Sequence, residues 1–272
     1  MSDTSAPVRI LAFIGASVFS LLGNVRLLIE EMGQVLILLG QSLVWMFRPP
    51  VRFREFVRQL DFVGAQSVVL IVLTGGFTGM VSALQGYIGM HKYGAESMVG
   101  ATVALALTRE LGPVISALMV VGRVGSSMTA ELGSMRNTQQ IDALSSMAVD
   151  PVQYLVVPRI FAAIMTLPIL ALIFSFAGMI GAYLISTQYL GVDAGTFMSG
   201  VRYYLDPDDV GHGVVKAAVF GLIIALVACF KGYYATGGAR GVGIATTRSV
   251  VISSVLVLVS DYAMTTLMFH RP

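Results

Sequence analysis

The sequence predicts an all-α integral membrane protein in which an N-terminal interfacial helix precedes about five transmembrane helices. Hydrophobic residues make up 56% of the 272 residues and charged residues only 12%, whereas soluble domains carry roughly 25% charged residues. The mean hydropathy is +0.82, and the apolar residues occur in long blocks rather than at the spacing of a half-buried helix or strand. We therefore expect a single membrane domain over residues 1–272.

The first apolar stretch, residues 8–47, is interrupted by Arg26, Glu30 and Glu31. These charges disfavour a full crossing, so we predict an elbow helix that lies along the inner leaflet or dips into it. The stretch lacks a short apolar core followed by a small-residue cleavage site, which indicates a retained segment rather than a cleaved signal peptide.

Later apolar blocks are long enough to cross about 30 Å of hydrocarbon. They comprise residues 62–90, 98–121, 160–187, 211–232 and 247–269. A basic cluster from Arg48 to Arg58 precedes the first block, whereas acidic residues gather between Asp193 and Asp209. The positive-inside rule then places the N-terminus in the cytoplasm and the C-terminus on the outer side of the membrane.

Arg109 and Glu110 lie near the centre of the block 98–121 and are followed by Gly112 and Pro113. A charge at bilayer depth costs several kcal/mol unless it is paired or faces water, so such residues mark a pathway. Adjacent helical residues point about 100° apart, so the two charges are not expected to satisfy each other alone. We expect the Gly-Pro step to break or kink the helix. A structural ion pair that locks helices together is the alternative.

Asp261 lies inside the last apolar block, beside Tyr262. A lone buried acid needs a partner, and Arg109 or a proton is the candidate. A hydrogen bond between packed helices is the alternative.

Gly75 and Gly79 form a small-xxx-small face in the first block. Such a face permits close approach of another helix, either in the same chain or in a second subunit. We assign the two glycines to dimer packing, with ordinary packing inside the chain as the alternative.

A polar ring is expected where the first block ends. Gln85 and Tyr87 lie toward this end, with Tyr93 just beyond it. The ring is placed to contact a lipid headgroup, although an interfacial Tyr is also a common membrane anchor.

Residues 123–150 are too polar and too long for a tight turn between two spans. Ser126, Ser127 and Thr129 are possible N-caps, and Met128, Leu132 and Met135 recur at helical spacing. The pattern predicts an amphipathic cytoplasmic helix that either lies on its own membrane domain or docks a soluble partner.

The sequence lacks the motifs typical of ATPases, other enzymes and metal-binding proteins. The chain has no G-x-x-x-x-G-K-[ST] phosphate-binding loop and no catalytic or metal-binding motif, and it has three histidines and one cysteine, Cys229. We therefore expect no enzyme, no ATPase, no cofactor and no metal on this chain. A net charge of +2 without a basic run gives no reason to expect nucleic-acid binding.

Several long ordered blocks resemble one family, the MlaE/YrbE permeases of bacterial phospholipid transport. The matching blocks are LTRELGPV at 107–114, GRVGSSMTAELG at 122–133, MAVDP at 147–151, LQGY at 84–87, ATTR at 245–248, and Asp261 with Tyr262. The resemblance covers nearly the whole chain beyond Pro50. It departs at Gln139, where the family pattern suggests an acidic residue, and in the segment before Pro50.

The resemblance implies a half-transporter of the bacterial inner membrane with a periplasmic C-terminus. It implies a homodimer, a separate cytoplasmic ABC ATPase that binds ATP and Mg, and a periplasmic MCE-domain protein. Phospholipid would occupy a cavity between the two subunits. The residues matched to the lipid cavity are Gln85, Tyr93, Arg109 and Glu110, to which we add Tyr87. The ATPase contact is assigned to Arg123, Thr129, Glu131, Leu132, Met135 and Arg136.

The leading hypothesis is therefore the permease subunit of an ATP-driven lipid transporter. One alternative is an ion-coupled secondary transporter that uses Arg109, Glu110 and Asp261 as a relay. The other is a structural membrane anchor for a periplasmic assembly.

Overall fold

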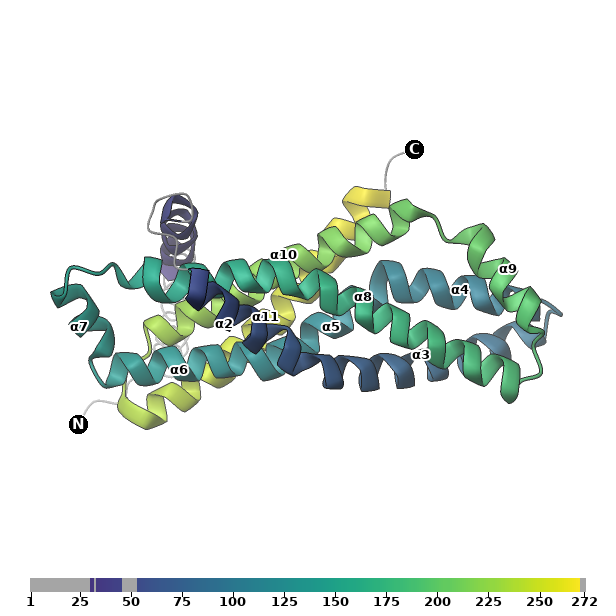
Figure 1. Ribbon diagram of the computed structural model, residues 1–272, viewed down its shortest axis with the longest axis horizontal. Coiled ribbons are helices and arrows are strands. Elements are labelled where there is room, and N and C mark those ends of the chain that lie inside the picture. The colour runs from purple at the N-terminus through teal and green to yellow at the C-terminus, as the bar shows by residue number, and fades with distance from the viewer. Residues whose placement is uncertain (1–29, 32, 46–52, 270–272) are drawn as a thin grey trace, which may run out of the picture.

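The computed structural model describes residues 30–31, 33–45 and 53–269. These residues contain helices and no strand, and the helices form an elongated bundle (Figure 1). Five of the helices are long and apolar enough to cross a membrane, which confirms the predicted all-α membrane fold. They cover Phe53–His91, Glu96–Asn137, Val152–Gln188, Pro207–Tyr233 and Gly238–Met268.

The first three long helices are built from several shorter elements. The first joins α2 (Phe53–Val63), η1 (Ala65–Ser67) and α3 (Val68–His91). The second joins η2 (Glu96–Met98), α4 (Val99–Ala106), η3 (Leu107–Leu111), α5 (Gly112–Val120), η4 (Val121–Gly125) and α6 (Ser126–Asn137). The third joins η5 (Val152–Val156) and α8 (Val157–Gln188), and the last two are α10 (Pro207–Tyr233) and α11 (Gly238–Phe269). The elements η3, η4 and η5 are π-helical.

Two short helices mark opposite ends of the bundle, which we call the α7 end and the α9 end (Figure 1). At the α7 end, α7 (Gln140–Ser146) follows α6, and the turn between α10 and α11 lies nearby. At the α9 end, Asp193 is the N-cap of α9 (Ala194–Tyr204), and its carboxylate accepts hydrogen bonds from the Thr196 amide at 2.8 Å and the Thr196 hydroxyl at 3.1 Å. These hydrogen bonds hold the pKa of Asp193 below its ordinary value. The α7 end is the one predicted to be cytoplasmic.

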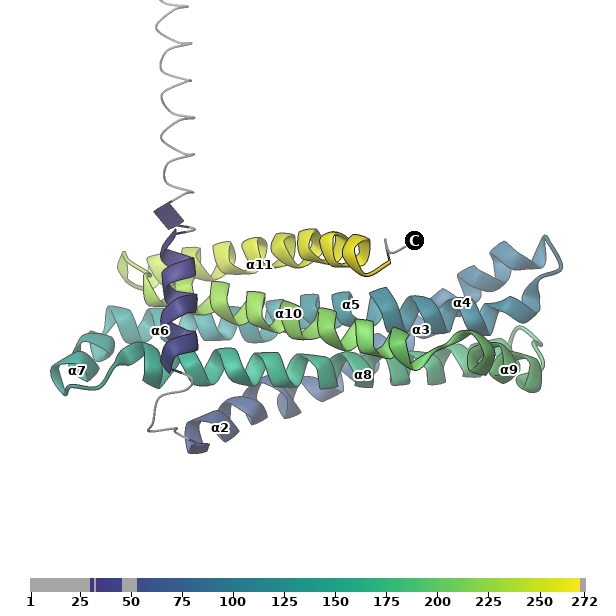
Figure 2. The same cartoon turned by 90° about the horizontal axis from the view of Figure 1, so that it is seen from above.

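The helix Gly33–Trp45 runs crosswise to the long helices near the α7 end (Figure 2). Its Leu38 side chain is only 2% exposed and packs in an apolar cluster with Ile160 and Phe230. Thirteen residues would span about 20 Å at the rise of an α-helix, too little to cross the hydrocarbon. Most of the predicted elbow helix, residues 8–29, lies outside the described residues.

The two glycines assigned to dimer packing lie against α8 of the same chain. A Cβ atom on Gly75 would come within 2.7 Å of the Phe174 carbonyl oxygen, and one on Gly79 within 1.8 Å of the Gly178 carbonyl oxygen. The backbones of α3 and α8 therefore approach closely along this face. Since α8 occupies the face, the assignment of Gly75 and Gly79 to dimer packing is wrong.

Candidate functional site

Five charged side chains meet where η3 lies beside the first turns of α10 and the last turns of α11, and we call them the charge cluster. They are Arg109, Glu110, Asp209, Lys216 and Asp261. The first two come from η3, the next two from α10 and the last from α11. The second long helix begins at Glu96, and Arg109 lies 13 residues further on, which corresponds to about 20 Å along this helix. The sequence prediction of charge inside an apolar block therefore identified three of the five members, Arg109, Glu110 and Asp261.

Arg109 binds Asp209 from the start of α10. Its Nη2 lies 2.6 Å and its Nε 2.7 Å from Asp209 Oδ1. The Asp209 side chain is 5% exposed and also accepts a hydrogen bond from the Asp206 amide, in a capping box at the N-terminus of α10. The arginine therefore pairs with a carboxylate that the helix cap already holds in place.

Glu110 belongs to a second network centred on Lys216, which is fully buried. The Lys216 ammonium lies 2.5 Å from Glu110 Oε2, 3.0 Å from Asp261 Oδ1 and 2.7 Å from Thr265 Oγ1. These three acceptors match the three N–H donors of an ammonium group. Arg109 and Glu110 thus bind different partners, as their 100° separation on a helix predicts.

The partner of Asp261 is Lys216, so the expectation that Arg109 or a proton would fill that role is wrong. Lys216 stands in the apolar block 211–232. The cost of burying a charge, which identified Arg109, applies equally to this lysine and would have found it. Asp209 was harder to single out from the sequence because Asp206 and Asp208 lie beside it, outside the apolar blocks.

The Gly-Pro step was predicted to break or kink the helix, and the predicted break does not occur. The helix is continuous from Glu96 to Asn137 because a π-turn absorbs the proline. The amide of Gly112 donates to the carbonyl oxygen of Leu107, five residues earlier, and Ser175 of α8 donates to the same oxygen at 3.0 Å. Such π-turns are frequent at functional sites, and this one contains both charged residues.

The charge cluster is partly open on the surface of the chain. The side chains of Arg109, Glu110 and Asp261 are 33%, 36% and 20% exposed, respectively. Charge at this depth is tolerated only where it meets water, a polar partner or the head of an amphiphile. The cluster therefore offers both signs of charge to whatever fills the adjoining space.

The polar ring at the end of α3 lies apart from the charge cluster. Tyr87 stacks on His91 with ring centroids 5.2 Å apart, and Tyr93 is 86% exposed. Gly86 lies opposite Val99 at the start of α4, which places the exposed Gln85 near the α9 end. The structure therefore brings Arg109 and Glu110 together with other charges but not with Tyr93.

The predicted coupling segment is not a separate helix. Its first part, α6, continues the membrane helix, and neither Ser126 nor Thr129 acts as an N-cap, because each donates to a carbonyl oxygen four residues earlier. Thr129 and Leu132 are fully buried, and Thr129 also binds Ser249 of α11. The assignment of Thr129 and Leu132 to ATPase contact is therefore wrong.

Arg123 is also engaged within the chain. Its guanidinium donates to the Phe62 carbonyl oxygen at 3.0 Å, to Ser67 Oγ at 2.6 Å and to Gln66 Oε1 at 2.9 Å. These bonds attach η4 to the junction of α2 and α3, which gives Arg123 a structural role. Because Arg123 remains partly exposed, its predicted contact with an ATPase stays a prediction.

Glu131, Met135 and Arg136 keep exposed or half-buried positions on α6. Glu131 pairs with the buried Arg159 at 2.8 Å, and Arg136 pairs with Asp142 of α7 at 2.6 Å. Gln139, at the departure from the family pattern, has a φ of 58° and joins α6 to α7. The exposed surface of the coupling segment is thus the α6–α7 corner.

Comparison with known proteins assigns the chain to a family. The family described as Permease MlaE matches residues 56–267. A probable ABC transporter permease protein of Rickettsia bellii is 45% identical over 242 residues, which cover 89% of this chain and 93% of the relative.

Two further relatives carry more specific names. The intermembrane phospholipid transport system permease protein MlaE of Haemophilus influenzae is 40% identical over 225 residues, or 82% of this chain and 86% of the relative. The chloroplastic protein TRIGALACTOSYLDIACYLGLYCEROL 1 of Arabidopsis thaliana is 35% identical over 234 residues, or 86% of this chain and 67% of the relative. With its five long apolar helices, the chain is a multi-pass membrane protein and belongs to the MlaE permease family.

Proposed function

We propose that the chain is the permease subunit of an ATP-driven phospholipid transporter in the bacterial inner membrane. It works as a homodimer with a separate cytoplasmic ABC ATPase, which binds ATP and Mg, and with a periplasmic MCE-domain protein. The name of the Haemophilus influenzae relative, an intermembrane phospholipid transport permease, supports this choice of substrate. The N-terminus is cytoplasmic and the C-terminus periplasmic.

The observation that carries the proposal is the partly exposed charge cluster within apolar helices. A phospholipid headgroup presents a phosphate and, in many lipids, an amine. Arg109 presents a cation to the first, and Glu110 and Asp261 present carboxylates to the second. The cluster thus offers a polar stopping point for a headgroup between the two faces of the membrane, where no such point exists in hydrocarbon.

The continuous helix Glu96–Asn137 provides the link to the ATPase. It carries the α6–α7 corner at one end, and Arg109 and Glu110 lie about a third of the way along from the other end. Movement imposed at the corner would shift η3 against α10 and α11, which supply the partners of both residues. ATP-driven motion would thereby loosen the ion pairs and release the headgroup.

The test is reconstitution of the chain with its ATPase and its MCE-domain partner in phospholipid vesicles. We expect Glu110→Gln to lower ATP-dependent lipid transfer at least about ten-fold while the complex still assembles. Asp208→Asn is the matched control, because Asp208 is an exposed carboxylate in the first turn of α10, next to the buried Asp209.

Unchanged transfer by the Glu110→Gln complex would contradict the proposal and favour a structural anchor. Transport by the permease alone, driven by a proton gradient without nucleotide, would favour the ion-coupled alternative.

A further inference from the structure

The backbone on both sides of α7 adopts a left-handed conformation without glycine. Among the residues that the structure describes, two non-glycine residues have a positive φ, Gln139 and Ala148, each at 58°. The other positive φ angles belong to glycines, namely Gly94, Gly191, Gly237 and Gly238. A left-handed conformation costs a non-glycine residue roughly ten-fold in equilibrium, because its Cβ atom crowds the following carbonyl oxygen. The chain therefore holds strain at both ends of one helix.

Hydrogen bonds close each end of α7. At its start, the Gln139 amide donates to a carbonyl oxygen of α6 at 3.2 Å. At its end, the Ala148 amide donates to the Ser145 carbonyl oxygen at 3.1 Å. The Val149 amide donates to the Leu144 carbonyl oxygen at 3.0 Å, and the last two bonds form a Schellman motif. Glycine is the usual residue at the left-handed position of this motif, where the chain has Ala148.

Few side chains hold α7 to the bundle. Of its seven residues, only Ile141 is buried, in the apolar cluster that also contains Leu38. Leu144 is half-buried, and Met147, directly after the helix, is 71% exposed. The strain at the two ends is therefore opposed by the burial of little more than one apolar side chain.

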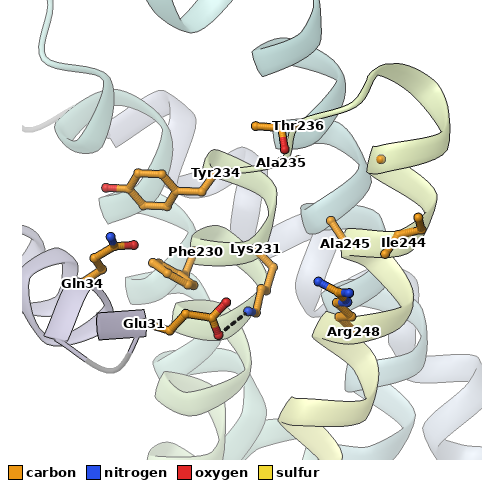
Figure 3. A pocket seen from close by; sticks show the side chains of 11 residues that line it. Glu31, Gln34, Phe230, Lys231, Tyr234, Ala235, Thr236, Ile244, Ala245 and Arg248 are labelled. Carbon is orange, nitrogen blue, oxygen red and sulfur yellow. Dashed lines mark hydrogen bonds and ion pairs between the residues drawn. The ribbon is translucent and has the colours of Figure 1, made fainter. Parts of the chain in front are cut away.

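The segments before and after α7 are packed more firmly. A Cβ atom on Gly133 of α6 would lie 3.2 Å from Val242 and 3.3 Å from Ala235, so α6 packs directly against α11 and the turn between α10 and α11. Figure 3 shows Ala235 and Thr236 in this turn. Three of the five residues of η5, which follows α7, are buried. A weakly held helix thus lies between two fixed ones.

We propose that α7 is a strained flap, which opens as a unit by rotation about Gln139 and Ala148 while α6 and η5 stay in place. In the open form, both residues leave the left-handed region. Relief of their strain offsets part of the cost of withdrawing Ile141 from the apolar cluster. The open flap presents Ile141 and Leu144 beside the exposed Met147, an apolar helix face that fits a partner protein with an apolar groove.

The flap regulates the proposed contact between the α6–α7 corner and the ATPase. This use rests on the proposed function, whereas the opening itself requires no partner. If the ATPase binds the open form, its apparent affinity is reduced to the fraction of chains that are open. A substitution that favours the closed form must then weaken ATPase binding by the factor by which it reduces opening.

Hydrogen exchange of the purified full chain in detergent, followed by mass spectrometry, measures the opening of α7. Gln139→Gly and Ala148→Gly relieve strain in the closed form, so each should slow the exchange of the α7 amides about five-fold. The matched controls are Gln140→Gly and Ala143→Gly, which place glycine at helical positions of α7 and should speed the exchange. A general effect of glycine on flexibility would speed the exchange in all four variants.

Unchanged or faster exchange in both Gln139→Gly and Ala148→Gly would overturn the proposal, because strain would then not set the stability of the closed form. Exchange of the α10 amides, expected to stay unchanged, reports an intact fold. The affinity for the ATPase should fall about five-fold in each of the two slow variants. Equal affinities of these variants and the unaltered chain would reject the regulatory role. Failure of the unaltered chain to bind the ATPase would contradict the proposed function and leave the opening of the flap standing.

Discussion

The charge cluster and the α6–α7 corner use ion pairs in opposite ways. In the cluster, Lys216 pairs with residues 106 and 45 positions away in the chain, on two other helices, and is fully buried. At the corner, Arg136 pairs with Asp142 only six positions away, and the two side chains are 38% and 59% exposed, respectively. Pairs of the first kind fix how helices pack, whereas an exposed local pair exchanges partners at little cost.

Glu131 and Arg159 stand between these two cases. Glu131 lies one helical turn before the corner and is 45% exposed, but its partner Arg159 is 3% exposed. The buried arginine also donates to the Leu155 carbonyl oxygen at 2.9 Å. In each ion pair, the more buried of the two side chains therefore indicates the role of the pair. A pair with a buried member stabilises the fold, whereas a pair without one leaves its charges available to another protein.

The largest effect is expected from Lys216→Met. The substitution keeps a similar side-chain volume but leaves Glu110 and Asp261 without their shared cation. Loss of one partner from a buried pair costs about 3 kcal/mol of unfolding free energy. Unfolding of the detergent-purified protein, followed by circular dichroism, measures the loss.

Lys92→Met serves as the control, because Lys92 is an exposed lysine just after α3. The triple variant Lys216→Met, Glu110→Gln and Asp261→Asn should regain at least half of the lost stability, since it removes the stranded carboxylates. A Lys216→Met protein as stable as the Lys92→Met protein would show that the cluster does not hold the helices together.

A smaller effect is expected from Glu131→Gln. It removes the anionic partner of the buried Arg159, which should cost about 2 kcal/mol of unfolding free energy because Glu131 itself is partly solvated. Asp142→Asn removes the partner of the exposed Arg136 and should cost less than about 1 kcal/mol. The same unfolding measurement on both variants tests the distinction, and equal losses would contradict it.

The sequence predicted where the charge cluster and the coupling segment lie better than it predicted which residues take part in each. Arg109 and Glu110 were found because an apolar block makes a charge conspicuous at any position. The same argument found Asp261 and applies to Lys216, but the packing of α10 and α11 against η3 decides which of these charges pair.

The same reasoning was weaker on α6. Helical spacing placed Met128, Leu132 and Met135 on one face, but spacing alone does not say what that face meets. In the structure, Met128 and Leu132 are fully buried within the chain. The glycines show the same limit, since a small-xxx-small face on α3 fits α8 as readily as a second subunit.

The smallest effect on stability, and the sharpest test of the corner, is expected from Arg136→Asp. Because the pair with Asp142 is exposed, unfolding free energy should change by less than about 1 kcal/mol, whereas affinity for the partner ATPase should fall about ten-fold if the proposed contact is direct. The double variant Arg136→Asp with Asp142→Arg rebuilds the local pair in reverse. Binding that stays weak in the double variant assigns the contact to the Arg136 side chain itself. Binding that returns would mean that Arg136 acts only by holding α7 in place, and unchanged binding in the single variant would remove Arg136 from the ATPase interface.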